Sequence, residues 1–209
     1  MAGKFITLEG GEGAGKTTLI EGLKGALERD GLTVVKTREP GGTPNAEAIR
    51  ELLLSGDVER WSPVSEALLF YAARVDHAER VIRPAIERGD WVLCDRFADS
   101  TRAYQGAAGG TDRSRLAALH KVALGDFEPD LTLVVDIDPN VGLERTWARG
   151  EKETRFEAKG SVFHERLRQA FLEIAAAEPE RCAVIDGGQS AGDVLDAALG
   201  VISSRFGTP

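Results

Sequence analysis

A run of small residues that ends in a lysine and a threonine has the clearest chemical meaning in this sequence. It begins at Gly10, ends at Thr17 and follows the pattern G-x-x-x-x-G-K-T. In loops of this pattern the glycines let backbone N–H groups turn inward around phosphates, while the lysine, here Lys16, reaches the outer phosphates. The hydroxyl of Thr17 is offered to Mg²⁺. The pattern therefore predicts a protein that uses ATP or GTP.

The residues on either side support a phosphate loop. An apolar run at residues 5–8 precedes it, and apolar residues at helical spacing follow it. A helix that starts near Lys16 adds the positive end of its dipole to the phosphate site. The alternative is a flexible glycine-rich hairpin, which the flanking strand and helix argue against. The residues predicted to bind the nucleotide are Gly10, Gly11, Glu12, Gly13, Ala14, Gly15, Lys16, Thr17 and Thr18.

Charged residues follow two further strand-like runs. Arg38 comes after residues 33–37, at the start of a turn rich in proline and glycine, and Asp95 and Arg96 come after residues 91–94. The carboxyl ends of parallel strands carry the site in such folds. Asp95 is suited to hold Mg²⁺ directly or through water, and Arg96 to grip a phosphate with its guanidinium fork. A purely structural Asp95–Arg96 ion pair remains open as an alternative.

An aromatic ring and a guanidinium share one face of a predicted helix. Phe70 and Arg74 stand four residues apart, which places them on the same side. Such a pair can stack on a nucleobase and donate a hydrogen bond to its carbonyl. Periodicity alone favours an ordinary amphipathic helix, so this assignment depends on the other motifs.

A highly charged segment bracketed by glycines interrupts the regular pattern at residues 149–160. Its composition alone favours a solvated surface loop. A phosphotransferase, however, must exclude water from the γ-phosphate and neutralise transition-state charge, and an arginine-bearing segment that closes does both. We therefore interpret the segment as a lid.

Short β-rich runs alternate with helical patterns along the whole chain. Strands are predicted at residues 5–8, 33–37, 91–94, 131–135 and 182–185, and helices near 17–30, 45–54, 64–88, 113–124, 140–149, 162–177 and 191–204. The strands are almost continuously apolar, which indicates a sheet buried on both faces. The alternation predicts a doubly wound parallel α/β sheet. We expect a single domain over residues 1–209.

Composition limits the partners and the compartment. With 42% hydrophobic and 29% charged residues, the chain resembles an ordinary globular domain, and its net charge of −8 argues against a nucleic-acid surface. No apolar run is long enough for a membrane span, so we expect a cytoplasmic protein. Cys94 and Cys182 are expected as buried, reduced thiols. We expect His77, His120 and His164 at the surface or an interface, without catalytic roles.

Taken together, these motifs resemble those of the bacterial thymidylate kinase family, in order along almost the entire chain. They are residues 10–18, 38–43 (R-E-P-G-G-T), 70–74 (F-Y-A-A-R), 95–97 (D-R-F) and 103–106 (A-Y-Q-G), continued by 125–132 and by the lid. The combination is far more specific than the phosphate loop by itself. The resemblance implies a P-loop nucleoside-monophosphate kinase fold with a helical lid, a homodimer, and ATP- and Mg²⁺-dependent phosphorylation of dTMP to dTDP in dTTP biosynthesis.

The resemblance also implies how the acceptor is held. Glu12 would approach the sugar 3′-OH, Arg38 and Arg96 would hold the acceptor phosphate, and Tyr104 would crowd the position of a ribose 2′-OH. The residues implied for the thymine pocket are Phe70 for stacking, Arg74 for donation to O4, and Thr101 and Gln105 to complete the wall.

Transfer to a phosphate acceptor needs no catalytic base. The second pKa of a phosphate monoester is about 6, so the acceptor is mostly an unprotonated nucleophile near neutral pH. Positioning and charge neutralisation remain as the catalytic tasks. The residues predicted to perform them are Lys16, Asp95, Arg96 and, from the lid, Arg149 and Arg155, with Thr17 and Asp95 as the Mg²⁺ ligands.

Two departures from the family pattern matter. Phe97 stands where many relatives have Tyr, so any hydroxyl role is lost there. Gly13 stands where eukaryotic relatives carry an arginine, which leaves charge neutralisation to the lid.

Two rival functions compete with this one. The first is another nucleotide or deoxynucleoside kinase, against which the base-pocket residues argue. The second is a GTPase switch, but the N-K-x-D motif that recognises the base in such proteins is absent from the sequence.

Overall fold

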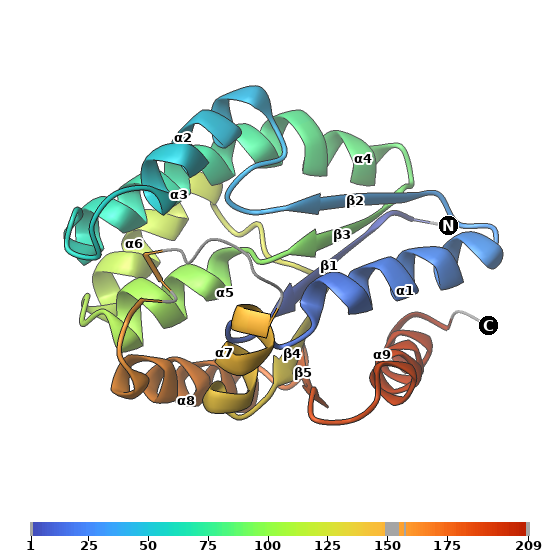
Figure 1. Cartoon of the computed structure of the whole chain (residues 1–209). Coiled ribbons are helices and arrows are strands. Elements are labelled where there is room, and N and C mark those ends of the chain that lie inside the picture. The colour runs from blue at the N-terminus through green and yellow to red at the C-terminus, as the bar shows by residue number, and fades with distance from the viewer. Residues whose placement is uncertain (1, 149–154, 157, 208–209) are drawn as a thin grey trace.

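A parallel sheet organises the protein. The computed structural model describes residues 2–148, 155–156 and 158–207. Its five strands lie in the order β2-β3-β1-β4-β5, and every neighbouring pair is parallel. The central strand pairs through Ile6 with Leu93 of β3 and with Leu131 of β4. Figure 1 shows helices on both sides of this sheet, which confirms the doubly wound α/β prediction.

Each strand ends one residue later than the sequence predicts, at a charged residue. The strands are β1 (Lys4–Glu9), β2 (Val34–Arg38), β3 (Trp91–Asp95), β4 (Leu131–Asp136) and β5 (Cys182–Asp186). The apolar run that predicts each strand ends before this charged residue, but backbone pairing between the strands continues through it, as between Arg38 and Asp95. The ladder therefore fixes the backbone of these charged residues at the carboxyl edge of the sheet.

The helices follow the predicted order with two additions. They are α1 (Lys16–Arg29), α2 (Pro44–Leu54), α3 (Pro63–His77), α4 (Arg83–Glu87), α5 (Ala98–Thr101), α6 (Arg113–Leu124), α7 (Pro139–Ala148), α8 (Ser161–Ala177) and α9 (Ala191–Phe206), with π-helical turns η1 (Ala78–Ile82) and η2 (Arg102–Ala108). The single helix predicted over residues 64–88 is thus interrupted by η1. Residues 98–108, which had no predicted element, form α5 and η2.

Side chains that alternate along the strands divide the core between two faces. Ile6, Leu8 and Leu93 pack with α1 and α9 on one face, whereas Phe5 and Val92 pack with α3, η1, α4 and α6 on the other. Helix α8 and η2 cover Val134 and Cys182 on that second face. Because apolar side chains point to both faces of the sheet, helices pack on both faces, and the loops that connect helices with strands lie at the strand ends.

The cysteine prediction is confirmed, whereas the predicted surface position of the histidines is wrong. Cys94 and Cys182 are free and buried. His77, His120 and His164 are also buried, at 0%, 6% and 3% exposure. The His77 ring is hydrogen-bonded to Thr37 and Glu39, and the His120 ring to Tyr71.

The lid prediction falls partly on residues that the structure describes. Residues 149–154 and 157 lie outside them, and Arg149 is among these. Arg155, Phe156 and the described residues up to Gly160 form turns and bends between α7 and α8. Across the described chain, none of the helices has the length and apolarity needed to cross a membrane.

Candidate active site

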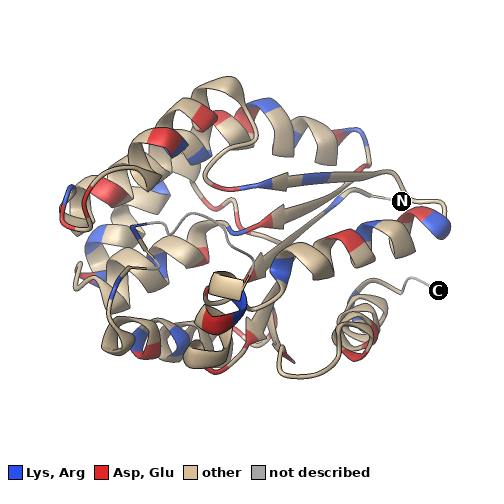
Figure 2. Cartoon of the chain, viewed as in Figure 1, with Lys and Arg blue, Asp and Glu red and all other residues tan. Residues whose placement is uncertain are grey.

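A cavity of about 220 Å³ lies where the phosphate loop, α3 and the ends of β2 and β3 meet. Figure 2 shows charged segments at the carboxyl ends of these strands. The cavity is lined mainly by arginines, carboxylates and aromatic rings. The lining residues are Glu12, Arg38, Glu39, Pro40, Arg50, Leu54, Phe70, Arg74, Asp95, Arg96, Phe97, Ser100, Tyr104 and Phe156. An apolar wall beside several fixed cations suits a ligand with a flat ring and an anionic group.

The phosphate loop closes onto its own lysine. Gly15 has φ 92° and leads directly into α1, so the loop turns at the N-terminus of that helix. Lys16 Nζ donates to the carbonyl oxygens of Gly10 (3.1 Å) and Gly11 (2.7 Å). Burial and the nearby Arg96 charge lower the pKa of Lys16 to about 8. Thr17 and Thr18, in the first turn of α1, are exposed to solvent.

Gly13 is required by close packing against α7. Its φ is 66°, and a Cβ there would lie 1.8 Å from the backbone oxygen of Gly142. Gly142 itself has no room for a Cβ, which would meet the Glu12 carbonyl oxygen at 2.2 Å. A side chain at position 13 therefore requires α7 to move, which gives a physical reason for the missing loop arginine.

Arg96 and Glu12 form the charged centre of the cavity. Arg96 Nη2 donates to Glu12 Oε2 at 3.1 Å, and Tyr104 donates its hydroxyl to Glu12 Oε1 at 2.6 Å. The guanidinium also lies over the Tyr104 ring, 5.0 Å from its centroid. Burial would raise the pKa of Glu12, but the charges of Arg96 and Lys16 and the Tyr104 hydrogen bond together lower it. Glu12 is thus held ionised beside the phosphate loop.

Arg74 is almost completely buried in the wall of the cavity. Its Nε donates to Glu39 Oε2 at 2.6 Å, and its Nη2 donates to the Phe97 carbonyl oxygen and to Thr101 Oγ1. Its Nη1 is buried and has no hydrogen-bond partner among the described residues. A buried donor without an acceptor is costly, so Nη1 is available to a ligand carbonyl.

Phe70 lines the cavity, but two predicted base-pocket residues lie behind its wall. The Phe70 ring is 6.1 Å from the Phe156 ring, between centroids. Thr101 accepts from Arg74, and Gln105 Nε2 donates to Glu66 Oε2 at 3.1 Å. Neither Thr101 nor Gln105 lines the cavity. Their direct contact with a base stays a prediction.

Sequence reasoning missed one arginine of the cavity. Arg38 Nη2 pairs with Glu47 at 3.2 Å, and Arg50, three residues beyond Glu47 on α2, also lines the cavity. Arg50 Nη1 donates to the Pro40 carbonyl oxygen at 2.8 Å, while burial and the Arg38 charge lower its pKa. The signal that could have identified it is this helical spacing of i and i+3 from Glu47. With Arg38, Arg74 and Arg96, Arg50 brings the arginines that line the cavity to four.

Arg155 is anchored away from the phosphate loop. Its guanidinium donates to the carbonyl oxygens of Leu53 (2.8 Å), Asp57 (2.6 Å) and Val58 (2.8 Å), and to Glu66 Oε1 (2.8 Å). The residue is 3% exposed. In this conformation Arg155 joins the predicted lid segment to α3, to the end of α2 and to the residues that follow α2. Its catalytic role stays a prediction, one that requires these four bonds to break.

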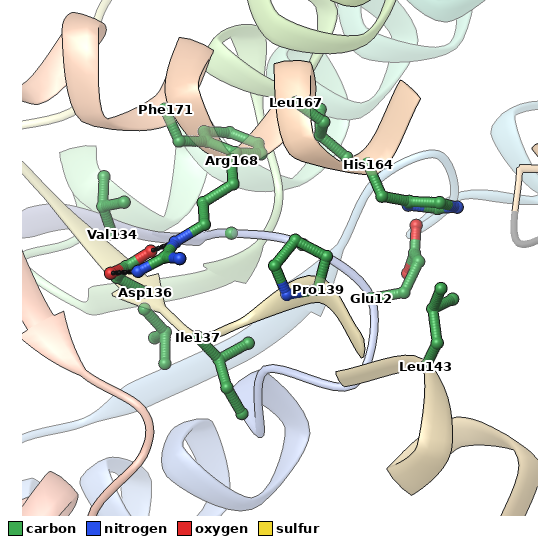
Figure 3. Close-up of a pocket in the computed structure, with 13 residues that line it drawn as sticks. Glu12, Val134, Asp136, Ile137, Pro139, Leu143, His164, Leu167, Arg168 and Phe171 are labelled. Carbon is green, nitrogen blue, oxygen red and sulfur yellow. Dashed lines mark hydrogen bonds and ion pairs between the residues drawn. The ribbon is translucent and has the colours of Figure 1, made fainter. Parts of the chain in front are cut away.

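A second, narrower pocket lies between the phosphate loop, the end of β4 and α8 (Figure 3). Arg168 of α8 makes a bidentate pair with Asp136, at 2.7 and 2.8 Å. Figure 3 shows the His164 ring beside the Glu12 carboxylate. His164 Nε2 is buried with no partner in the described part of the chain. Helix α8 therefore packs directly against the loop that carries Lys16.

The arrangement fits a phosphotransferase that depends on Mg²⁺. Asp95 lines the cavity, and its Oδ1 is buried without a partner among the residues described. Thr17, which directly follows Lys16 in the sequence, is exposed to solvent. No cluster of three or more His, Cys, Asp or Glu side chains that could hold a metal occurs within the described ranges. Mg²⁺ keeps several waters and takes further ligands from substrate phosphates, so two protein ligands are enough.

Comparisons with known proteins agree on one family. A family model described as thymidylate kinase matches residues 8–198. The chain is 57% identical over 205 residues to the thymidylate kinase of Caulobacter vibrioides, covering 98% of each protein. It is 50% identical over 208 residues to that of a Bradyrhizobium species, covering 99% of this chain and 92% of the relative. The crystal structure of thymidylate kinase from Ehrlichia chaffeensis superposes with a TM-score of 0.78 at 35% identity, covering 97% of this chain and 99% of the other.

Proposed function

Since this chain belongs to the thymidylate kinase family and phosphorylates dTMP to dTDP with ATP, we propose that the cavity of about 220 Å³ is its dTMP site. The observation that supports this most is the buried Nη1 of Arg74, which has no partner among the described residues. Thymine offers a carbonyl oxygen, O4, to such a donor. Cytosine has an amino group at that position, which would leave two donors facing each other.

The remaining acceptor contacts follow from the same placement. Phe70 stacks on the thymine ring, and Glu12 accepts from the sugar 3′-OH. Tyr104, held to Glu12 by its hydroxyl, occupies the space that a ribose 2′-OH would need. Arg38, Arg50 and Arg96 neutralise the acceptor phosphate.

The phosphate loop binds the donor. The inward N–H groups of the loop would hold the ATP phosphates, and Lys16 would neutralise the outer ones. Thr17 and Asp95 would hold Mg²⁺, which would supply further positive charge to the phosphates. Because the acceptor phosphate is already a nucleophile, the protein contributes alignment and charge cancellation, without removing a proton.

The assembly and location extend the family assignment. We propose one kinase domain over residues 1–209, with 149–160 as its lid, acting in the cytoplasm. We also propose a homodimer through α2, α3 and α6, since Leu52, Leu68 and Val122 on these helices are 44%, 53% and 87% exposed. Light scattering after gel filtration tests this, and a mass of one chain contradicts it.

A panel of acceptors tests the dTMP site. We expect kcat/KM to fall from dTMP to dUMP by about 10- to 200-fold or less, because a methyl group contributes only about 1–3 kcal/mol. We expect kcat/KM for dCMP to be lower still, because cytosine would leave buried donors without acceptors. Equal activity on dTMP and dCMP would contradict the assignment of the cavity.

A further inference from the structure

Glu9 is a fully buried carboxylate at the carboxyl end of β1, directly before the phosphate loop. Its Oε1 accepts from the backbone N–H groups of Phe97 (2.7 Å) and Ser100 (3.2 Å), and its Oε2 accepts from Ser100 Oγ (2.6 Å). Three donors from one short segment therefore converge on this carboxylate. Through these three hydrogen bonds Glu9 fastens residues 97–100 to the central strand.

The segment that Glu9 fastens begins immediately after Arg96, whose backbone is strained. Arg96 has φ 70°, and among the described residues no other non-glycine residue has a positive φ. Such a conformation persists only when its surroundings hold it. Arg96 N donates to the Leu8 carbonyl oxygen at 2.9 Å, and the next N–H, that of Phe97, donates to Glu9. The last two residues of β1 thus hold the backbone on both sides of the Arg96 side chain.

Ser100 connects Glu9 to the Arg96 guanidinium as well. A hydroxyl has one proton, which Ser100 donates to Glu9, so its lone pairs can accept from Arg96 Nη1 at 3.2 Å. Arg96 Nη1 also donates to the Gly10 carbonyl oxygen at 3.0 Å. An amide nitrogen in place of Glu9 Oε2 would donate to Ser100 and turn the hydroxyl proton toward the guanidinium. The orientation of the Ser100 hydroxyl, which donates to Glu9 and accepts from Arg96, therefore depends on an acceptor at Glu9 Oε2.

This carboxylate is held in an unfavourable environment. The pKa of Glu9 is raised to about 7, because burial and the Asp99 charge raise it by more than Arg96 and the bonds from Ser100 and Phe97 lower it. A neutral group of the same shape would avoid this desolvation cost. Strongly shifted groups of this kind are concentrated at functional sites.

We propose that Glu9 is a positioning residue for the acceptor phosphate, holding the Arg96 guanidinium toward the cavity through Phe97 N–H and Ser100. The inference rests on the proposed function, in which Arg96 binds the phosphate of dTMP. Glu9 itself does not line the cavity, so it acts through Arg96.

Steady-state kinetics of E9Q and S100A test the proposal, with D130N as a matched control. Asp130 Oδ2 also accepts a backbone N–H of β1, that of Phe5 at 2.8 Å, but at the opposite end of the strand. Because misplacement by about 1 Å can cost about 10²-fold, we expect E9Q to lower kcat/KM for dTMP by about 10- to 100-fold and S100A by less. KM for ATP should stay within about twofold. D130N should leave both parameters unchanged.

A double-mutant cycle with R96A separates positioning from general stability. If Glu9 acts through Arg96, E9Q adds no further loss of kcat/KM in the R96A background. Losses that multiply in E9Q/R96A would overturn the positioning role. R96A with unchanged dTMP kinetics would instead contradict the proposed function, on which the inference rests. If E9Q unfolds at assay temperature, the S100A/R96A cycle gives the same two outcomes.

Discussion

Arg155 donates to Glu66 at 2.8 Å in a buried ion pair that joins the described part of the predicted lid segment to α3. The two side chains are 1% and 4% exposed, and Arg155 makes its other bonds to three backbone carbonyls. The lid arginine that the sequence assigns to catalysis therefore also has a structural role. Predictions about it must separate stability from rate.

Replacing Arg155 should destabilise the protein through Glu66. R155A leaves a buried carboxylate without its cation, and breaking a buried pair costs about 3–5 kcal/mol. In R155A/E66Q the uncompensated charge is gone, so we expect part of that loss to be recovered. Urea unfolding of the single and double variants measures the loss in free energy of unfolding. Strictly additive losses in the double variant would show that Arg155 and Glu66 are not coupled.

The catalytic role of Arg155 predicts a separate kinetic effect. If its guanidinium leaves these acceptors and contacts the moving phosphoryl group, R155A lowers kcat more than KM for dTMP, by about 10³-fold or less. The assay is run well below the unfolding midpoint of the variant. An unchanged kcat would leave Arg155 with the structural role alone.

Lys16 should be needed for turnover but not for folding. Removing one donor aimed at transition-state charge costs about 10²- to 10³-fold in kcat, so K16A should lose at least this much. Lys24, which pairs with Glu28 on the solvent side of the same helix, provides the control variant K24A. Near-normal turnover by K16A would mean that the phosphate loop is wrongly assigned.

The Tyr104 ring should set the preference for deoxyribose. We expect Y104L, which keeps an apolar side chain among the surrounding rings, to narrow the ratio of kcat/KM for dTMP and its ribose counterpart. Y104F removes only the hydroxyl bond to Glu12 and should keep the ratio. If the ratio does not change in Y104L, Tyr104 does not limit the sugar.

Arg74 should carry the discrimination between thymine and cytosine. Because R74A would leave Glu39 buried and unpaired, R74K is the more informative change, since it keeps a cation but not the forked donor. We expect R74K to bring kcat/KM for dTMP and dCMP closer together. A ratio equal to that of the wild type would assign base selection to another residue.

Both thiols should be inert in the folded protein. Burial raises the pKa of Cys182 to about 12 and that of Cys94 well above its ordinary value, so very little thiolate exists at pH 8. Iodoacetamide should modify neither residue in the native protein and both after unfolding, as measured by mass spectrometry. Rapid labelling of a folded sample would contradict this.

The sequence by itself determined the elements whose causes are local. The phosphate loop needs only the spacing of its glycines, Lys16 and Thr17, and the strands needed only apolar runs between helical patterns. The strand ends were one residue short because ladder pairing, unlike hydrophobicity, continues into charged residues such as Asp95. The family resemblance added the roles of Phe70 and Arg74, which periodicity alone would have left in an ordinary amphipathic helix.

Tertiary structure decided which side chains meet. Arg50 shares a helix face with Glu47, but the sequence does not show that this face packs against Pro40 and lines the cavity. The strand predicted over residues 5–8 left Glu9 without a role, and only the structure shows Phe97 N–H and Ser100 Oγ donating to its carboxylate. Arg155 found Glu66 across 89 positions of sequence. Contacts of this range depend on how helices pack on the sheet, and a single sequence carries no direct signal of that packing.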